Sequence, residues 1–375
     1  MRVLIVQRSL SPPGGGNAVA AWMVHALCRH HEVGTLTMGD WSVADTNAFY
    51  GTSIDAAVRR HVVPAPWQWL SNLREDRITR LRMSAVLHYA RPLAAHYDLL
   101  ITADNFAVFA RPGIQYVHFP ARLQPQPARL QAIVNVYFAL CGRLLGSPWT
   151  DAAENMTLVN SRWTAERLSG LGEVSTPIVL YPPVLDPGPG LPWADRDDTF
   201  LCIGRFDESK RIEVSIAIVK AARARALPGA KLIIVGSAVN SAYHARIRAI
   251  ADREGPWIEF REDVSRLELG RLMGRSRYGI QAMQGEHFGM ATAEMTRAGC
   301  LVFAHHSGGS PEVLDHKDTL LWLTEEDAAE KIAAIASGRH SPAQLSAALR
   351  EHAQAFSTDM FEETFRRLVA TAQVS

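Results

Sequence analysis

Cysteine is scarce in this chain of 375 residues. Its four cysteines, Cys28, Cys141, Cys202 and Cys300, lie far apart in apolar stretches, and no Cys-x-x-Cys pair or Cys/His cluster occurs. This spacing excludes the usual structural zinc sites and the disulfide framework of small secreted domains. We interpret the cysteines as reduced core residues of a cytosolic protein.

An excess of charge of either sign is also missing, since 39 basic residues face 38 acidic ones. The first half, residues 1–180, contains no lysine and is mildly basic, with 16 arginines against 12 acids. A net charge of +1 gives no global reason to expect nucleic acid as a partner. We expect a small or locally recognised partner instead.

Long apolar runs are absent as well. No uncharged apolar run approaches the ~20 residues that a membrane-spanning helix needs. The apolar run at residues 3–6 is too short for a signal sequence and is followed by Gln7 and Arg8, so it predicts a first strand. The expected location is the cytoplasm, with peripheral contact at the inner face of the membrane as the alternative.

The chain does contain short apolar, β-branched runs that alternate with helical patterns, which predicts parallel α/β sheets. The first half has five candidate strands: 2–7, 98–103, 114–119, 157–160 and 178–181. Residues 181–192 hold five prolines and two glycines and break the pattern. The second half has six candidate strands: 200–203, 231–235, 258–260, 278–282, 301–304 and 319–323. We predict two Rossmann-like, doubly wound domains, residues 1–182 and 183–356, with a cleft between their strand ends.

A loop with two cations follows the first strand of the second half. Gly204 allows close backbone approach to a ligand, and Arg205 and Lys210 place positive charge where a diphosphate would need it. A solvated, charged loop is the alternative for this motif taken alone.

A loop with two glutamates follows the strand at 278–282. Gly285 and Gly289 allow a tight turn before a helix, with Glu286 just outside the helix and Glu294 inside it. The turn presents three backbone N–H groups that suit anions and hydroxyls: those of Phe288, Gly289 and Met290. Carboxylates among apolar residues need partners, and sugar or ribose hydroxyls are suitable. A surface helix that carries two glutamates is the alternative.

These two segments, in this order, resemble the donor-binding domain of the retaining GT-B glycosyltransferases of family 4. The resemblance implies that Arg205 and Lys210 contact the donor diphosphate, that Glu286 lies near the transferred sugar and that Glu294 binds the nucleotide ribose. It also implies that main-chain groups at 288–290 hold the donor sugar and that a C-terminal helix, 357–375, crosses back to the first domain.

The first half agrees with this resemblance. The glycine-rich loop 11–17 precedes a helix expected from about Ala18. Gly15 and Gly16 are expected to approach the donor phosphate or the acceptor. The equally weighted alternative is that they are ordinary turn glycines. The loop is not a dinucleotide fingerprint, because position 19 is Val. The strand at 114–119 delivers His118, which the resemblance places facing the donor sugar as a catalytic residue beside Glu286; a structural histidine is the alternative.

The amino-acid sequences of three segments, 116–120, 285–290 and 304–309, are most similar to the branch of the family that contains the eukaryotic lipid-linked-oligosaccharide mannosyltransferase. This similarity favours transfer of mannose from GDP-mannose to a glycan, lipid-linked or small-molecule acceptor. The alternatives are a UDP-sugar-dependent transferase of the same fold, a nucleotide-sugar 2-epimerase and a non-catalytic sugar-nucleotide binder. The expected front-face transfer uses no cofactor and no metal, because Arg205 and Lys210 stabilise the departing diphosphate.

The acceptor side is less defined. Trp67, Trp69 and Leu70, followed by Arg74, Arg77, Arg80 and Arg82, form one candidate membrane-surface or anionic-acceptor element, and residues 132–145 form a second. Packed core helices are the alternative for both stretches.

Overall fold

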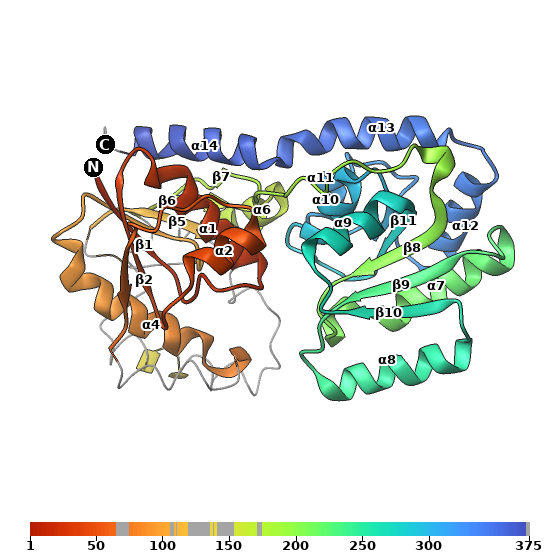
Figure 1. Cartoon of the computed structure of the whole chain (residues 1–375), viewed down its shortest axis with the longest axis horizontal. Helices are drawn as coiled ribbons and strands as arrows, with labels where there is room; N and C mark the ends of the chain where they lie inside the picture. The colour runs from red at the N-terminus through yellow and green to blue at the C-terminus, as the bar shows by residue number, and fades with distance from the viewer. Residues whose placement is uncertain are drawn as a thin grey trace. The chain divides into compact units, whose positions relative to one another are not determined.

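The computed structural model describes residues 1–64, 75–105, 109, 111–118, 136, 137, 139, 140, 154–170 and 175–372, with backbone alone in 75–80. The chain divides into two compact units, each with its own sheet (Figure 1). Unit 1 comprises Met1–Pro183 with Thr358–Ser375, and unit 2 comprises Val184–Ser357.

The described part of unit 1 contains a seven-stranded parallel sheet of order β3-β2-β1-β4-β5-β6-β7. Its strands are β1 (Arg2–Val6), β2 (Glu32–Thr37), β3 (Arg59–Val62), β4 (Leu99–Thr102), β5 (Ile114–Val117), β6 (Met156–Val159) and β7 (Ile178–Val179). Its helices are α1 (Gly15–Cys28), α2 (Val43–Tyr50), α4 (Glu75–Ala94), α6 (Arg162–Ser169) and α14 (Thr358–Thr371). The central strands are buried along their length because helices cover a parallel sheet on both faces.

Two strands of unit 1 are absent from the sequence prediction. β2 contains Gly34 and three polar residues, and β3 begins with Arg59 and Arg60 at the edge of the sheet. Neither has the continuous apolar run of a central parallel strand, so pairing rather than propensity makes them strands. Helix α1 also begins three residues earlier than expected, at Gly15.

Unit 2, all of whose residues are described, contains a six-stranded parallel sheet of order β10-β9-β8-β11-β12-β13. Its strands are β8 (Asp197–Ile203), β9 (Lys231–Gly236), β10 (Ile258–Glu262), β11 (Ser276–Gln281), β12 (Leu301–His305) and β13 (Leu321–Trp322). Its α-helices are α7 (Ile212–Arg225), α8 (Ser241–Glu254), α9 (Arg266–Arg275), α10 (Met290–Arg297), α11 (Ser310–Val313), α12 (Glu325–Ala336) and α13 (Pro342–His352). Three short 3-10 helices complete it: η4 (Trp193–Asp195), η5 (Glu208–Lys210) and η6 (Ala353–Phe356).

Neighbouring strands of unit 2 carry the aromatic part of its core. The rings of Phe200 on β8 and Tyr278 on β11 stack with centroids 4.8 Å apart, and Phe303 on β12 packs beside them. Side-chain caps begin several of the helices: Asn240 and Ser265 each accept a hydrogen bond from a backbone N–H in the first turn. The predicted α/β fold, with two Rossmann-like sheets, is confirmed.

The C-terminal helix belongs to unit 1, where it packs against α1 (Figure 1). Phe361, Phe365 and Val369 on one face of α14 are buried. On α14, Arg366 donates from Nε to the carbonyl oxygen of Ala26 at the end of α1, over 2.9 Å. The chain therefore completes unit 1 only after it has passed through unit 2.

Candidate functional site

The first candidate loop leaves β8 and turns sharply before α7. Asp207 caps the short helix η5, its Oδ1 accepting from the backbone N–H of Ser209 over 3.0 Å. Lys210 ends η5, and Arg211 adopts a left-handed conformation before α7 begins. A Cβ at Gly204 would lie 3.4 Å from Lys210 Cε, an ordinary van der Waals distance, so the lysine stem runs alongside the backbone of Gly204.

The second candidate loop leaves β11 and enters α10. Gly285 and Gly289 have φ of 63° and 105°, the left-handed region that favours glycine. Gly289 is the N-cap of α10, which begins at Met290. Phe288 is buried and its ring packs against that of Phe356, so this residue offers a ligand its backbone.

A third loop, residues 307–309 after β12, holds the second in place. The N–H of Gly285 donates to Ser307 Oγ over 2.8 Å, and the N–H of Gly309 donates to the carbonyl oxygen of Glu286 over 2.7 Å. A Cβ at Gly308 would overlap the backbone of Glu286. Residues 307–309 thus support the loop that carries Glu286.

The structure brings Lys210 and Glu286 together across 76 residues of sequence. Lys210 Nζ lies 2.6 Å from Glu286 Oε2, and both side chains are about one-fifth exposed. They meet because β8 and β11 are parallel neighbours, so the loops that follow them leave the same edge of the sheet. Partial burial reduces the screening of this ion pair by water and salt.

Arg205 stands in a different environment from Lys210. Its side chain is 66% exposed, and its Nε lies 3.6 Å from Asp207 Oδ2. Of the two predicted diphosphate ligands, Arg205 is thus mostly open to solvent with a long carboxylate contact, and Lys210 is largely buried with a short one.

Glu294 lies in the second turn of α10 and is 7% exposed. Its Oε1 accepts from Arg266 Nη1, at the first position of α9, over 2.8 Å. Arg266 is absent from the sequence prediction, because the contact depends on how α9 and α10 pack. A weak signal exists: a cation in the first turn of a helix is unfavourable to the helix dipole and needs an acidic neighbour.

In unit 1, His118 follows β5 and is held at three atoms. Its backbone N–H donates to Asn105 Oδ1 over 2.9 Å, and its carbonyl oxygen accepts from Asn160 Nδ2 over 2.9 Å. Its Nε2 lies 2.8 Å from the carbonyl oxygen of Ala103. A carbonyl oxygen can only accept, so Nε2 carries the proton and Nδ1 of the neutral ring is an acceptor.

Burial lowers the pKa of His118, and the Asp104 carboxylate opposes that shift. Asp104 is buried and forms a two-point ion pair with Arg8, in which Arg8 Nη2 donates to Asp104 Oδ1 over 2.9 Å. Arg8 and Asp104 are not among the predicted site residues. They follow β1 and β4, which with β5 form three neighbouring strands, so polar residues at strand ends were the available signal.

The glycine-rich loop also reaches His118. A Cβ at Gly16, in the first turn of α1, would lie 3.2 Å from His118 Nε2. Gly15 is exposed and opens the helix. Glycine at position 16 therefore permits the close approach of α1 to the histidine.

The candidate acceptor elements lie mostly outside the described residues. Trp67, Trp69, Leu70 and Arg74 are not described, nor are the side chains of Arg77 and Arg80, and of 132–145 only residues 136, 137, 139 and 140 are. Arg82 is buried, which agrees with the packed-helix alternative at that position. Among the described residues no helix combines the length and the apolar character needed to cross a membrane.

Residues 189–355, which contain the candidate loops after β8 and β11, match the family model described as "Glycosyl transferases group 1". This segment is a group 1 glycosyltransferase domain. The match confirms the resemblance drawn from the Arg205–Lys210 and Glu286–Glu294 motifs, and the group 1 domain coincides with most of unit 2.

Curated relatives share much of the chain. A human protein named "GDP-Man:Man(3)GlcNAc(2)-PP-Dol alpha-1,2-mannosyltransferase" is 27% identical over 297 residues, which are 72% of this chain and 58% of the human protein. The mouse protein of the same name is 26% identical over 309 residues, 76% of this chain and 59% of its own length. The chain thus spans less than two thirds of these relatives.

Solved structures confirm the GT-B fold over the whole chain. An Anabaena protein, HepE, in complex with UDP and glucose has a TM-score of 0.72 and 15% identity, covering 99% of this chain and all of that one. Sucrose-phosphate synthase from Thermosynechococcus elongatus has a TM-score of 0.73 and 17% identity, covering 99% of each chain.

Proposed function

We propose that the chain is a retaining mannosyltransferase that moves mannose from GDP-mannose to a lipid-linked glycan. The observation that carries the proposal is the meeting of Lys210 with Glu286, 2.6 Å apart, beside the N-terminus of α10. A cation, a carboxylate and a helix N-terminus at one sheet edge suit a ligand that combines a diphosphate with sugar hydroxyls. The names of the human and mouse relatives support GDP-mannose and a dolichol-linked acceptor.

In the proposed reaction, the bond from the mannose anomeric carbon to the diphosphate oxygen breaks and its electron pair leaves with GDP. The acceptor oxygen bonds to the anomeric carbon on the same face, and its proton passes to the departing phosphate. Arg205 and Lys210 stabilise the charge that develops on the diphosphate, so the proposed transfer needs no metal or other cofactor. Gly15 and Gly16 give the diphosphate or acceptor close access to the start of α1.

The remaining site residues position the donor in this proposal. Glu294 accepts from the ribose, and the backbone groups of Phe288, Gly289 and Met290 bind mannose hydroxyls near Glu286. The neutral His118, with Nδ1 as an acceptor, takes a hydrogen bond from a sugar or acceptor hydroxyl. A lipid-linked acceptor also implies peripheral membrane contact on the cytoplasmic side, which the exposed Val136 and Leu140 support.

A UDP-sugar is the second candidate donor, because the HepE structures contain UDP. A thermal-shift screen of GDP- and UDP-sugars distinguishes the two, since a ligand at 100 times its Kd stabilises the folded state by about 2.7 kcal/mol. We expect GDP-mannose to give the largest shift. A larger shift with a UDP-sugar contradicts the proposed donor, and no shift with either class contradicts the proposed function.

Substitution of the diphosphate cations tests the reaction itself. Lys210→Ala or Arg205→Ala is expected to lower kcat by about 100- to 1,000-fold, the usual effect of losing one stabilising donor. Lys220→Ala is the matched control, because Lys220 forms an exposed pair with Glu254 in the same unit. Wild-type turnover in folded Lys210→Ala would refute the assignment, and donor consumption without a new glycoside would indicate an epimerase.

A further inference from the structure

The Arg266–Glu294 ion pair joins two different helices, α9 and α10. Arg266 follows the cap residue Ser265 at the start of α9, and Glu294 projects from α10. The Nη1–Oε1 distance is 2.8 Å, with the side chain of Arg266 32% exposed and that of Glu294 9% exposed. The Glu294 carboxylate is therefore shielded from water while Arg266 is about one-third exposed, and a residue of α9 binds a carboxylate of α10.

The two carboxylate oxygens of Glu294 differ in their hydrogen bonding. Arg266 binds Oε1, and no hydrogen bond from any described residue reaches Oε2. A planar, permanently charged guanidinium fixes the carboxylate more firmly than a flexible ammonium does. Without it, a carboxylate this buried would lose its charged partner and turn toward water.

We propose that Arg266 is a positioning residue that holds Glu294 by Oε1 so that Oε2 accepts from a ribose hydroxyl of the nucleotide. The inference rests on the proposed function, in which Glu294 binds the ribose. It adds that the Arg266–Glu294 pair makes the site selective for ribonucleotides over their deoxy counterparts. A site built to bind a hydroxyl rejects the analogue that lacks it, because its buried polar group is left unpaired.

The test compares GDP with 2′-deoxy-GDP and 3′-deoxy-GDP, and UDP with its deoxy forms, by isothermal titration calorimetry. For the wild-type chain we expect at least about tenfold tighter binding of the ribonucleotide than of one deoxy form. Arg266→Met keeps the length of the side-chain stem. In this variant the ratio of ribonucleotide affinity to deoxynucleotide affinity should fall below about threefold, while the affinity for the deoxynucleotide stays near wild type. Arg266→Lys should restore part of the ratio, since it returns the charge without the fixed geometry.

Three further variants separate positioning from folding: Arg275→Met, Glu294→Gln and the double variant Glu294→Gln/Arg266→Met. Arg275→Met on the same helix removes an exposed pair with Asp197 and should leave the ratio unchanged. Glu294→Gln should lower the ratio by itself, and adding Arg266→Met to it should lower the ratio no further, because both changes act through one carboxylate. If Arg266→Met does not fold, the affinity ratios of Arg266→Lys and Arg266→Gln are compared with that of the wild-type chain instead.

The binding data distinguish failure of the role inferred for Arg266 from failure of the proposed function. If the wild-type chain discriminates but Arg266→Met keeps the full ratio, or loses affinity for both forms equally, the inference is wrong and the proposed function stands. If the wild-type chain binds neither GDP nor UDP, both are wrong.

Discussion

Lys210 and Glu286 each have a partner before any ligand arrives. Their ion pair satisfies both charges at the sheet edge, and Met283 Sδ also lies 3.2 Å from Lys210 Nζ. In the proposed function, a donor diphosphate therefore competes with the Glu286 carboxylate for the same ammonium group. The proposed binding step would exchange one anion for another and leave Glu286 available to sugar hydroxyls.

This exchange predicts opposite effects of one substitution on binding and on catalysis. Glu286→Gln should raise the affinity for GDP about threefold to tenfold, since loss of a partly exposed competing pair is worth roughly 1 kcal/mol. The same change should lower transfer, because a carboxylate near the sugar is lost. Calorimetric titration with GDP and initial rates give the two values.

Glu259→Gln is the matched control for this prediction, because Glu259 pairs with Arg261 on an exposed part of β10. Weaker binding of GDP to folded Glu286→Gln, with normal binding to the control, would show that Glu286 does not compete for Lys210.

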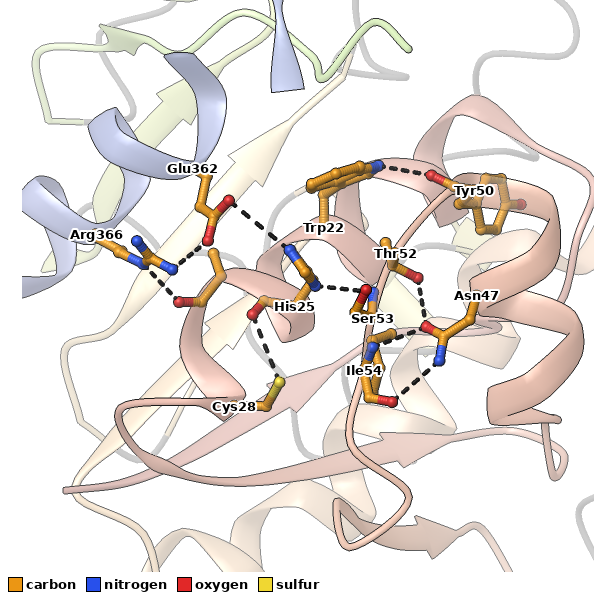
Figure 2. A network of polar contacts seen from close by, with 11 residues as sticks. Trp22, His25, Cys28, Asn47, Tyr50, Thr52, Ser53, Ile54, Glu362 and Arg366 are labelled. Atoms are coloured by element: carbon orange, nitrogen blue, oxygen red, sulfur yellow. Dashed lines mark hydrogen bonds and ion pairs between the residues drawn. The ribbon is translucent and has the colours of Figure 1, made fainter. Parts of the chain in front are cut away.

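At the scale of elements, a polar network ties α14 to α1 and to the segment that follows α2 (Figure 2). His25 Nδ1 accepts from the backbone N–H of Ser53 over 2.9 Å, and His25 Nε2 faces Glu362 Oε2 at 3.8 Å. Glu362 also pairs with Arg366. Asn47 holds the same segment, accepting from the N–H of Ile54 over 2.8 Å. One histidine thus connects three parts of unit 1.

The network predicts that acid weakens unit 1. Burial lowers the pKa of His25, with Arg29 and Arg366 acting in the same direction and Glu362 opposing them. The unfolded chain therefore takes up a proton near its usual pKa of about 6.5 before the folded chain does. The contribution of His25 to stability is present above that pH and is lost as pH falls through the folded pKa. Protonation at Nδ1 also breaks the bond from Ser53.

His25→Asn tests this expectation, because the asparagine retains an acceptor and does not titrate. The free energy of unfolding, measured in urea from pH 7.5 to 5, should fall less steeply in the variant than in the wild-type chain. The other histidines with lowered pKa are common to both proteins and cancel in the difference. His30→Asn, at an exposed position, should follow the wild-type curve; parallel curves for His25→Asn would show that His25 does not titrate as argued.

Elements differ in how well the sequence predicted them. The strands that lead into the site have apolar runs and were predicted: β1, β4, β5 and β11 within one or two residues, and β8 with the correct end but a start three residues late. β2 and β3 were missed because their polar residues satisfy neither the alternating nor the continuous apolar pattern. α1 was expected to start later, because glycines disfavour a helix, whereas the close approach of α1 to His118 favours glycine at position 16.

At the scale of the whole molecule, each unit buries apolar side chains around its own sheet, and the C-terminal helix packs against α1 of unit 1. The rings of Phe361 and Phe365 stack on α14 with centroids 5.8 Å apart, and Phe365 is fully buried. The residues proposed to bind the nucleotide lie in unit 2. Stability of the two units should therefore respond to different changes.

Phe365→Ala should destabilise unit 1 by about 3–5 kcal/mol through the cavity it leaves. GDP should mainly raise the unfolding temperature of unit 2 by mass action. Scanning calorimetry of the variant should then show two transitions, of which GDP shifts the upper one. Met360→Ala, at an exposed position of α14, is the control. A single transition that GDP shifts as a whole would show that the two units unfold as one.

The sequence by itself determined the fold class and the two candidate loops that follow β8 and β11. Apolar runs, positive-φ glycines and the spacing from Arg205 to Lys210 and from Glu286 to Glu294 are local features, so neighbouring residues suffice to specify them. Only the tertiary structure decided which of these side chains meet. Lys210 reaches Glu286 because β8 and β11 pair, Arg266 reaches Glu294 because α9 packs near α10, and His118 meets Gly16 through the order of β1, β4 and β5. Such contacts join residues far apart along the chain, and strand order and helix packing set them rather than local sequence.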